Sequence, residues 1–167
     1  MKVLVTAATR YRATAEIAEA IAEVLSERGL DVSVLPPEQV PGVDGYDAVV
    51  LGSAVYTGHW MPEASEFARR YGDALSTRPL WLFSSGPVGD PAGKLARAMG
   101  TDPVDIAEIR QATHACDHRM FAGKLERRHL GVLQRTALLV VPGLEGDFRD
   151  WGAIRAWAAE IAGSLSG

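Results

Sequence analysis

The sequence predicts an α/β fold in which a doubly wound, five-stranded parallel sheet has the strand order 2-1-3-4-5. Short apolar runs rich in β-branched residues alternate along the chain with amphipathic segments long enough to form helices. Strands separated in this way run parallel, and right-handed crossovers place helices on both faces of their sheet. The length of 167 residues, without internal repeats, favours a single domain over residues 1–167.

The first half of the chain carries the clearest periodicity. The run KVLVTA (2–7) predicts a buried strand, and the apolar residues from Ile17 to Leu25 recur at helical spacing. This helix is expected to begin near Thr14, as its N-cap, and to end near Arg28, before Gly29. The elements predicted next are a strand at 30–35, a loop at 36–46, a strand at 46–56, a helix at 62–77 and a strand at 80–85.

The second half gives weaker patterns. It predicts short helices at 92–99 and 103–111, a fifth strand at about 119–124, a helix at 127–140 and a last helix at 150–165. The apolar residues expected on the inner face of the last helix are Trp151, Ile154, Trp157, Ala158 and Ile161. Asp147 and Asp150 precede this helix and are interpreted as capping residues. The alternative is a contact with a cofactor edge or a partner.

Composition excludes several classes of protein. Seventeen basic and 21 acidic residues give a net charge of −4, which argues against nucleic acid as a partner. Cys116 is the single cysteine, so no internal disulfide can form, and a reducing, cytoplasmic location is favoured. No apolar run approaches the roughly 20 residues of a membrane helix, so no stable membrane insertion is expected.

In this fold, ligands bind beyond the carboxyl ends of the strands, where the loops after strands one, three and four converge. The first of these loops, Ala8 to Thr14, leads into a helix N-terminus that attracts anions. The hydroxyls of Thr9 and Thr14 and the charge of Arg10 or Arg12 suit a phosphate. Neither a Walker A sequence nor G-x-G-x-x-G is present, and an ordinary strand-to-helix turn is the alternative.

The other two loops suit a flat ring. In the segment 52–64, Tyr56 and Trp60 flank Gly58 and His59, and aromatic faces of this kind stack on heteroaromatic ligands. The alternative for Trp60 is packing against the following helix. The third loop, 83–91, offers serines and glycines whose backbone groups can meet a ring edge.

Taken together, these segments resemble the flavodoxin family, and specifically its protoporphyrinogen-oxidase-like flavodoxin-domain branch. The resemblance lies in the first loop and in the blocks VVLGSAVYTGHW, WLFSSGPVG, HRMFAGKL (118–125) and GDFRDWGAIRAWA (146–158). It implies a noncovalently bound FMN whose phosphate lies on Thr9, Arg10, Tyr11, Arg12, Ala13 and Thr14. The ring would lie between two groups of residues: Ser53, Ala54, Val55, Tyr56, Thr57, Gly58 and Trp60, and Ser84, Ser85, Gly86, Pro87, Val88 and Gly89.

The resemblance implies an FMN-dependent redox protein, either an electron carrier or a small oxidase or dehydrogenase, with protoporphyrinogen as its most concrete substrate. Its partner would be a redox protein, a quinone or a small molecule, and the oligomeric state stays open. Arg12 departs from the family, which usually has glycine two residues before the final threonine, where φ > 0 is permitted. The alternative is therefore a flavodoxin fold that has lost FMN and serves as a non-redox binding or regulatory module.

Two further groups of residues have side chains suited to other chemistry. His114, Cys116 and His118 would share one face if extended, as metal ligands do, but a fourth ligand is not evident and no metal is expected. No Ser-His-Asp set can be assigned. Arg127, Arg128 and Arg135 border an apolar helix face that packs against the core or, alternatively, touches a membrane surface or a quinone-bearing partner.

Overall fold

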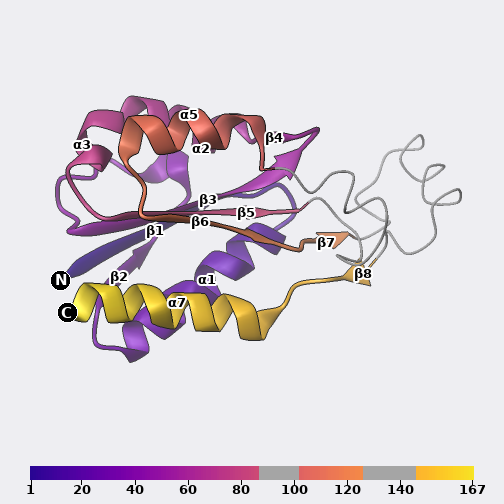
Figure 1. Cartoon of the computed structure of the whole chain (residues 1–167). Helices are drawn as coiled ribbons and strands as arrows, with labels where there is room; N and C mark the ends of the chain where they lie inside the picture. The colour runs from indigo at the N-terminus through magenta and orange to yellow at the C-terminus, as the bar shows by residue number, and fades with distance from the viewer. Residues whose placement is uncertain (87–101, 126–145) are drawn as a thin grey trace, which may run out of the picture.

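The computed structural model describes residues 1–86, 102–125 and 146–167. Its main sheet is parallel and has the order β2-β1-β3-β5-β6 (Figure 1). These strands are β1 (Lys2–Ala8), β2 (Asp31–Val34), β3 (Ala48–Tyr56), β5 (Leu80–Ser85) and β6 (Asp117–Phe121). Numbered along the chain as the five parallel strands, they confirm the predicted order 2-1-3-4-5.

Helices cover both faces of this sheet. One face carries α1 (Ala13–Glu27) and α7 (Trp151–Ser166), and the other carries α2 (Pro62–Arg70), α3 (Gly72–Ser76) and α5 (Val104–Thr113) (Figure 1). A short 3-10 helix, η1 (Pro37–Gln39), follows β2. Each face has its own apolar cluster, with Val3 and Val5 of β1 in one and Leu4 in the other. Burial on both faces explains why the strands read as continuous apolar runs.

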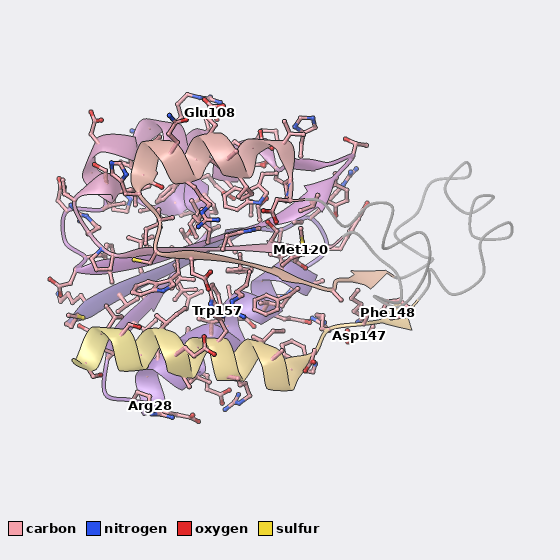
Figure 2. The ribbon with its side chains drawn as sticks, viewed as in Figure 1. Arg28, Glu108, Met120, Asp147, Phe148 and Trp157 are labelled. Atoms are coloured by element: carbon pink, nitrogen blue, oxygen red, sulfur yellow. The ribbon has the colours of Figure 1, made fainter. Side chains whose placement is uncertain are left out.

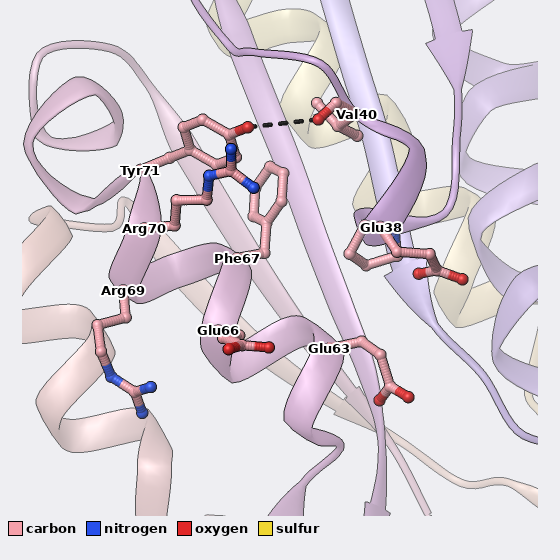
Figure 3. A pocket seen from close by; sticks show the side chains of 9 residues that line it. Glu38, Val40, Glu63, Glu66, Phe67, Arg69, Arg70 and Tyr71 are labelled. Atoms are coloured by element: carbon pink, nitrogen blue, oxygen red, sulfur yellow. Dashed lines mark hydrogen bonds between the residues drawn. The ribbon is translucent and has the colours of Figure 1, made fainter.

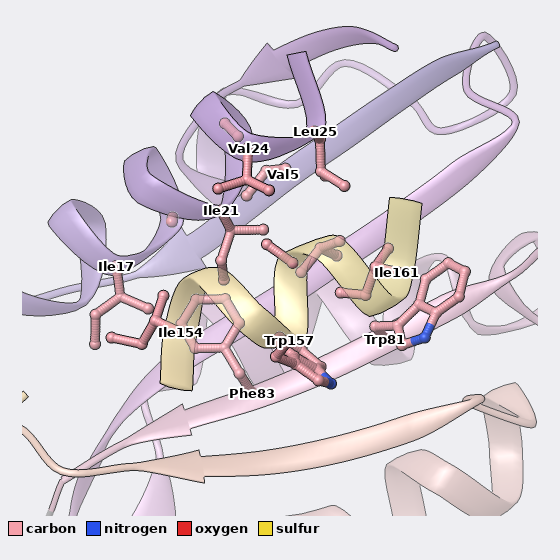
Figure 4. Packing of buried hydrophobic residues seen from close by; sticks show 14 of the residues in the cluster. Val5, Ile17, Ile21, Val24, Leu25, Trp81, Phe83, Ile154, Trp157 and Ile161 are labelled. Atoms are coloured by element: carbon pink, nitrogen blue, oxygen red, sulfur yellow. The ribbon is translucent and has the colours of Figure 1, made fainter. Parts of the chain in front are cut away.

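An aromatic group fills the α1–α7 side of the core. The rings of Phe83 and Phe121 lie 6.3 Å and 5.6 Å from that of Trp157, measured between centroids, and both meet it edge to face. Figure 4 shows Phe83 and Trp157 close together among the apolar side chains of α1 and α7. Trp157 points from α7 toward the sheet (Figure 2) and donates its indole N–H to Asp117 at 3.0 Å. Gly52 leaves the necessary space, because a Cβ there would lie 2.1 Å from Cζ of Phe83.

Two predicted boundaries and one predicted burial were wrong in these elements. The helix expected at 62–77 is interrupted at Tyr71, which leaves helical geometry ahead of the poor helix former Gly72 and donates its hydroxyl to the carbonyl of Val40. The fifth strand begins at Asp117 rather than near 119, because its first residues are polar yet pair with β5. Trp151, expected to be buried, is 38% exposed in the first turn of α7.

Three short strands were not predicted: β4 (His59–Trp60), β7 (Lys124–Leu125) and β8 (Gly146–Asp147). Strand β4 pairs antiparallel with β3, and β7 pairs antiparallel with β8. Two residues are too few for a strand periodicity to appear in the sequence. The predicted helices at 92–99 and 127–140, and the predicted site residues Pro87, Val88 and Gly89, lie outside the described residues.

Candidate functional site

The carboxyl ends of β1, β3 and β5 lie side by side. Ala8 pairs with Ser53, and Ser53 pairs with Ser84 across the next ladder, so β1 and β5 end near the same level while β3 continues to Tyr56. The predicted loops therefore leave the sheet at one edge, on the right of the view in Figure 1. This edge collects every described residue predicted to bind the cofactor, and the site is built there.

The first loop enters α1 through a left-handed residue. Arg12 has φ 65° and ψ −13° and occupies the N-cap position, so α1 begins at Ala13. The prediction that Thr14 is the N-cap is therefore wrong, and Thr14 is a buried residue of the first turn. Arg12 adopts the backbone conformation that glycine favours at this position, while its guanidinium meets the carboxylate of Glu19 at 2.7 Å.

The first turn of α1 offers unused hydrogen-bonding groups. No side chain caps α1 within the described part of the chain, so its leading N–H groups and the positive end of its dipole face the loop. The hydroxyl of Thr9 is buried in the same loop and has no partner among the described residues. A buried hydroxyl without a partner costs about 1–3 kcal/mol. An anionic ligand at this helix end would give it an acceptor.

Two tyrosines and one arginine form the outer part of this site. Cζ of Arg10 lies 5.4 Å from the ring centroid of Tyr11 and 5.5 Å from that of Tyr56, within cation–π distance of both. Both rings are about 40% exposed. Partial burial raises the pKa of the Tyr56 phenol despite the opposing charge of Arg10, so the ring stays neutral and offers a flat aromatic face.

The second loop is a tight hairpin. Thr57 and Gly58 have φ values of 50° and 79° between β3 and the antiparallel β4, which is the two-residue geometry that matches strand twist. Met61 donates its backbone N–H to the hydroxyl of Ser53 at 2.9 Å and closes the hairpin base. A Thr-Gly pair is a weaker hairpin signal than Asn-Gly, which explains why sequence inspection indicated only a turn.

The hairpin is fastened to α5. Gly58 accepts the backbone N–H of Val104 at 3.0 Å, and Asp105 accepts that of Trp60 at 2.9 Å. The His59 ring also lies 3.4 Å from Asp105. Trp60 is only 4% exposed and packs in one core cluster with Phe67 of the following helix, α2, which is the alternative given for it above. Tyr56 is the hairpin aromatic left at the surface.

A buried polar chain links the second loop to the third. The indole N–H of Trp60 donates to Oγ of Ser84 at 2.7 Å, and this oxygen lies 2.8 Å from Nε2 of His118. Nδ1 of His118 lies 3.5 Å from the carboxylate of the largely exposed Asp102. Burial lowers the pKa of His118, with Asp102 opposing this shift, so the ring is neutral near pH 7. Because the Asp102 carboxylate can only accept, the tautomer with the proton on Nδ1 suits this position, and Nε2 then accepts a hydrogen bond from the Ser84 hydroxyl.

The structure thus contains a Ser84–His118–Asp102 arrangement that sequence inspection could not assign, because its members lie far apart in the chain. Ser84 is completely buried and its oxygen already accepts from Trp60. A nucleophile must be open to its substrate, so these groups serve to hold two loops together. The third loop continues through Gly86, whose φ is 90° and whose N–H donates to Phe121 at 3.0 Å.

The remaining predicted ring-site residues are buried at this edge. Ser53, Ala54 and Val55 lie in the last part of β3 and Ser85 ends β5, and all are at most 9% exposed. Gly123 packs closely behind the third loop, since a Cβ there would lie 3.3 Å from the backbone of Gly86. These residues provide backbone groups and a close-packed wall rather than free side chains.

The C-terminal block contributes a residue that sequence reasoning missed. Asp150 caps α7 by accepting the N–H of Ala153 at 2.9 Å, as predicted. The side chain of Arg149, in contrast, lies against the first turn of α1. It donates there to Glu16, and on its other side it donates to Asp147 of β8. Figure 2 shows Asp147 at the end of the molecule where the strands finish. The sequence signal that could have indicated this role is the position of Arg149 between Asp147 and Asp150.

The other predicted groups do not assemble a site. His114 ends α5 with φ 54°, Cys116 is exposed, and His118 is buried against Ser84. Among the described residues, no cluster of three or more metal-ligating side chains is found. Within the three described ranges, no helix combines the length and apolar character needed to cross a bilayer.

A cavity of about 520 Å³ lies on another part of the surface, between η1 and α2. Figure 3 shows Phe67 and Tyr71 beside Arg70 on one side and Glu38 and Glu63 on the other. None of the residues predicted to bind the cofactor lines this cavity.

Comparison with known proteins identifies a family and a curated relative that this chain resembles. The family described as a flavodoxin domain matches residues 4–150. Protoporphyrinogen IX dehydrogenase [quinone] of Escherichia coli (strain K12) is 31% identical over 86 residues, a match that covers 50% of this chain and 48% of that protein. The chain is thus matched over about half the length of this curated relative.

Solved structures of flavodoxins share the fold. A flavodoxin from the domain Archaea has a TM-score of 0.67 at 16% identity, with both chains fully covered. Flavodoxin 1 from Bacillus cereus has a TM-score of 0.63 at 17% identity, with 98% of each chain covered. At these identities the likeness establishes the arrangement of strands and helices.

Proposed function

The chain belongs to the flavodoxin family and is an FMN-binding redox protein, and from this premise we propose that its FMN lies across the carboxyl ends of β1, β3 and β5. The phosphate meets the hydroxyl of Thr9 and the first turn of α1, which no side chain of the described residues caps. The ring lies between the 53–60 hairpin and the described start of the third loop, residues 84–86, with Tyr56 as the exposed aromatic face. When bound, FMN supplies the capacity to accept and release electrons.

The protein's own residues hold and shield this group. The left-handed Arg12 turns the chain so that the N–H groups of α1 face the phosphate. The Trp60–Ser84–His118 chain fixes the hairpin relative to the third loop. The hairpin also bonds to α5. These contacts preorganise both sides of the ring site before the cofactor enters, which reduces the ordering cost of binding.

The observation that carries the proposal is the buried hydroxyl of Thr9, which has no partner among the described residues and lies in the loop that leads into α1. Thr9→Val keeps the shape and removes the donor. Because a hydrogen bond to a charged group contributes about 1.5–3 kcal/mol, affinity for FMN should fall by roughly 10- to 100-fold. Flavin fluorescence during titration of the apo-protein measures this, with riboflavin, which lacks the phosphate, as the comparison ligand.

Thr6→Val is the matched control. Thr6 has a buried hydroxyl without a partner among the described residues, but it lies within β1 rather than in the loop. It should leave the FMN-to-riboflavin affinity ratio unchanged. If Thr9→Val lowers the affinities for both flavins equally, the phosphate is not on this loop. If the unaltered protein binds neither flavin, the chain is a non-redox binding or regulatory module.

A finer proposal concerns the substrate. We infer that the protein oxidises protoporphyrinogen with a quinone as electron acceptor in the cytoplasm, supported by the 86-residue match to the E. coli dehydrogenase. The FMN-loaded protein, given protoporphyrinogen IX and a soluble quinone without oxygen, should form fluorescent porphyrin and quinol together. Absence of porphyrin, with rapid electron exchange to a reduced redox protein, would instead identify an electron carrier.

A further inference from the structure

Arg149 places a buried guanidinium against the first turn of α1. Its side chain is 4% exposed. Nε and Nη2 donate to the two carboxylate oxygens of Asp147 at 2.8 and 2.7 Å, in a bidentate pair. Nη1 donates to the carboxylate of Glu16 and, at 3.3 Å, to the carbonyl of Ala13. One side chain therefore joins the start of α1 to the segment that precedes α7.

This guanidinium is fully committed to the protein. All three of its nitrogens donate to groups of the chain, and Cζ lies 4.6 Å from the ring centroid of Trp151. The bonds to Asp147 raise the pKa of Arg149 above its ordinary value, and those same bonds hold the pKa of Asp147 below its own. Arg149 is thus a fixed cation, too enclosed to bind a ligand directly.

The consequence for an anion concerns the two carboxylates. Glu16 lies in the first turn of α1, the turn whose N–H groups face the proposed phosphate site, and Asp147 lies on the other side of Arg149. A phosphate monoester carries a charge of about −1.5 to −2 near neutral pH. Without Arg149, both carboxylates would repel it across a partly buried site, where charges are weakly screened.

We propose that Arg149 is a positioning residue that gives the loop its selectivity for the phosphate of FMN over riboflavin, by neutralising Glu16 and Asp147 and holding the first turn of α1. The inference rests on the proposed FMN site. It assigns to the GDFRDW block a function beyond helix capping. Arg149 acts through α1 and does not itself touch the cofactor.

Arg149→Met in the full chain is the direct test. Affinity for FMN should fall by roughly 10- to 100-fold, as expected for two uncompensated charges near a phosphate, while affinity for riboflavin stays within about twofold, a change of under 0.5 kcal/mol. The deficit should shrink as salt rises, because screening weakens the repulsion. Adding Glu16→Gln to Arg149→Met removes one of these charges and should recover part of the lost FMN affinity.

Two further variants separate charge from folding. Arg149→Lys keeps the positive charge but loses the bidentate geometry, so it should retain most of the preference for FMN even if Arg149→Met folds poorly. Arg155→Met is the matched control. Arg155 also joins α7 to α1, through Glu23 at 2.7 Å, but it is 43% exposed and lies farther along both helices. It should leave the affinities for both flavins unchanged.

The results distinguish this inference from the function on which it rests. Equal losses for FMN and riboflavin in Arg149→Met, or a deficit that salt does not change, would overturn the inference and leave Arg149 a structural residue. An equal loss of FMN preference in Arg149→Lys and Arg149→Met would overturn it as well. If the unaltered protein fails to prefer FMN over riboflavin, the proposed site itself is wrong.

Discussion

Replacing Ser84 with alanine should destabilise the protein far more than the size of the change suggests. The Ser84 hydroxyl accepts from Nε1 of Trp60 at 2.7 Å and donates to Nε2 of His118 at 2.8 Å, and it is fully buried. Ser84→Ala leaves both partners buried without a hydrogen bond. Each such group costs about 1–3 kcal/mol, so the free energy of unfolding should fall by about 2–6 kcal/mol.

Urea unfolding of the apo-protein, followed by tryptophan fluorescence and circular dichroism, measures this loss as a shift of the midpoint at constant slope. Ser76→Ala is the matched control, because the Ser76 hydroxyl bonds only to the nearby carbonyl of Asp73 at an exposed position. Its effect should stay within about 0.5 kcal/mol. A shift for Ser84→Ala as small as that of Ser76→Ala would refute the reasoning.

A double-mutant cycle tests the cause of the loss. Trp60→Phe keeps an aromatic ring in place and removes the N–H donor, so Ser84→Ala in that background leaves only His118 without a partner. The two changes should then be coupled by about 1 kcal/mol. Strict additivity would show that the hydrogen bond between Trp60 and Ser84 contributes nothing to stability.

Three other changes have defined outcomes. Burial holds the pKa of His118 below its ordinary value near 6.5, so the unfolded chain binds this proton more readily and the free energy of unfolding falls as pH drops through about 6.5. In His118→Gln, the urea midpoint should depend less on pH between about pH 8 and 5. Arg12→Gly relieves about 1 kcal/mol of left-handed strain. Loss of the exposed pair with Glu19 and the greater freedom of the unfolded chain offset this gain. The melting temperature and the FMN affinity of Arg12→Gly should therefore stay nearly unchanged, whereas Arg12→Ala should lower the melting temperature. Gly52→Ala sets a Cβ 2.1 Å from Phe83 and should cost at least about 1–3 kcal/mol in urea unfolding.

The strand order could be predicted because it depends on features that each segment carries alone. Buried parallel strands are continuous apolar runs, and helices between them repeat every three to four residues. The start of β6 could not be predicted in this way. Its first residues, Asp117 and His118, are polar, and their side chains find hydrogen-bond partners in Trp157 and Ser84. Because these partners come from distant elements, no local pattern in the sequence shows that the strand begins here.

The candidate site likewise contains residues that local sequence patterns predict and residues that they do not. Its three loops could be found from strand ends and helix starts, and Arg12 marked the position that needs a left-handed backbone. The groups that support these loops could not, since Arg149 meets Glu16 across 133 positions of sequence and Asp105 meets Trp60 across 45. Contacts of this kind follow from the tertiary arrangement, and local propensity does not encode them.

The pairing of β7 with β8 has a consequence for how the site tolerates a change of register. Lys124 pairs with Asp147 and Leu125 pairs with Gly146, so this short ladder fixes the position from which Asp147 meets Arg149. A slip of one residue in a strand turns every side chain to the opposite face. An insertion or deletion of a single residue within β8 would therefore direct the Asp147 carboxylate away from Arg149, while the parallel sheet itself would keep its pairing.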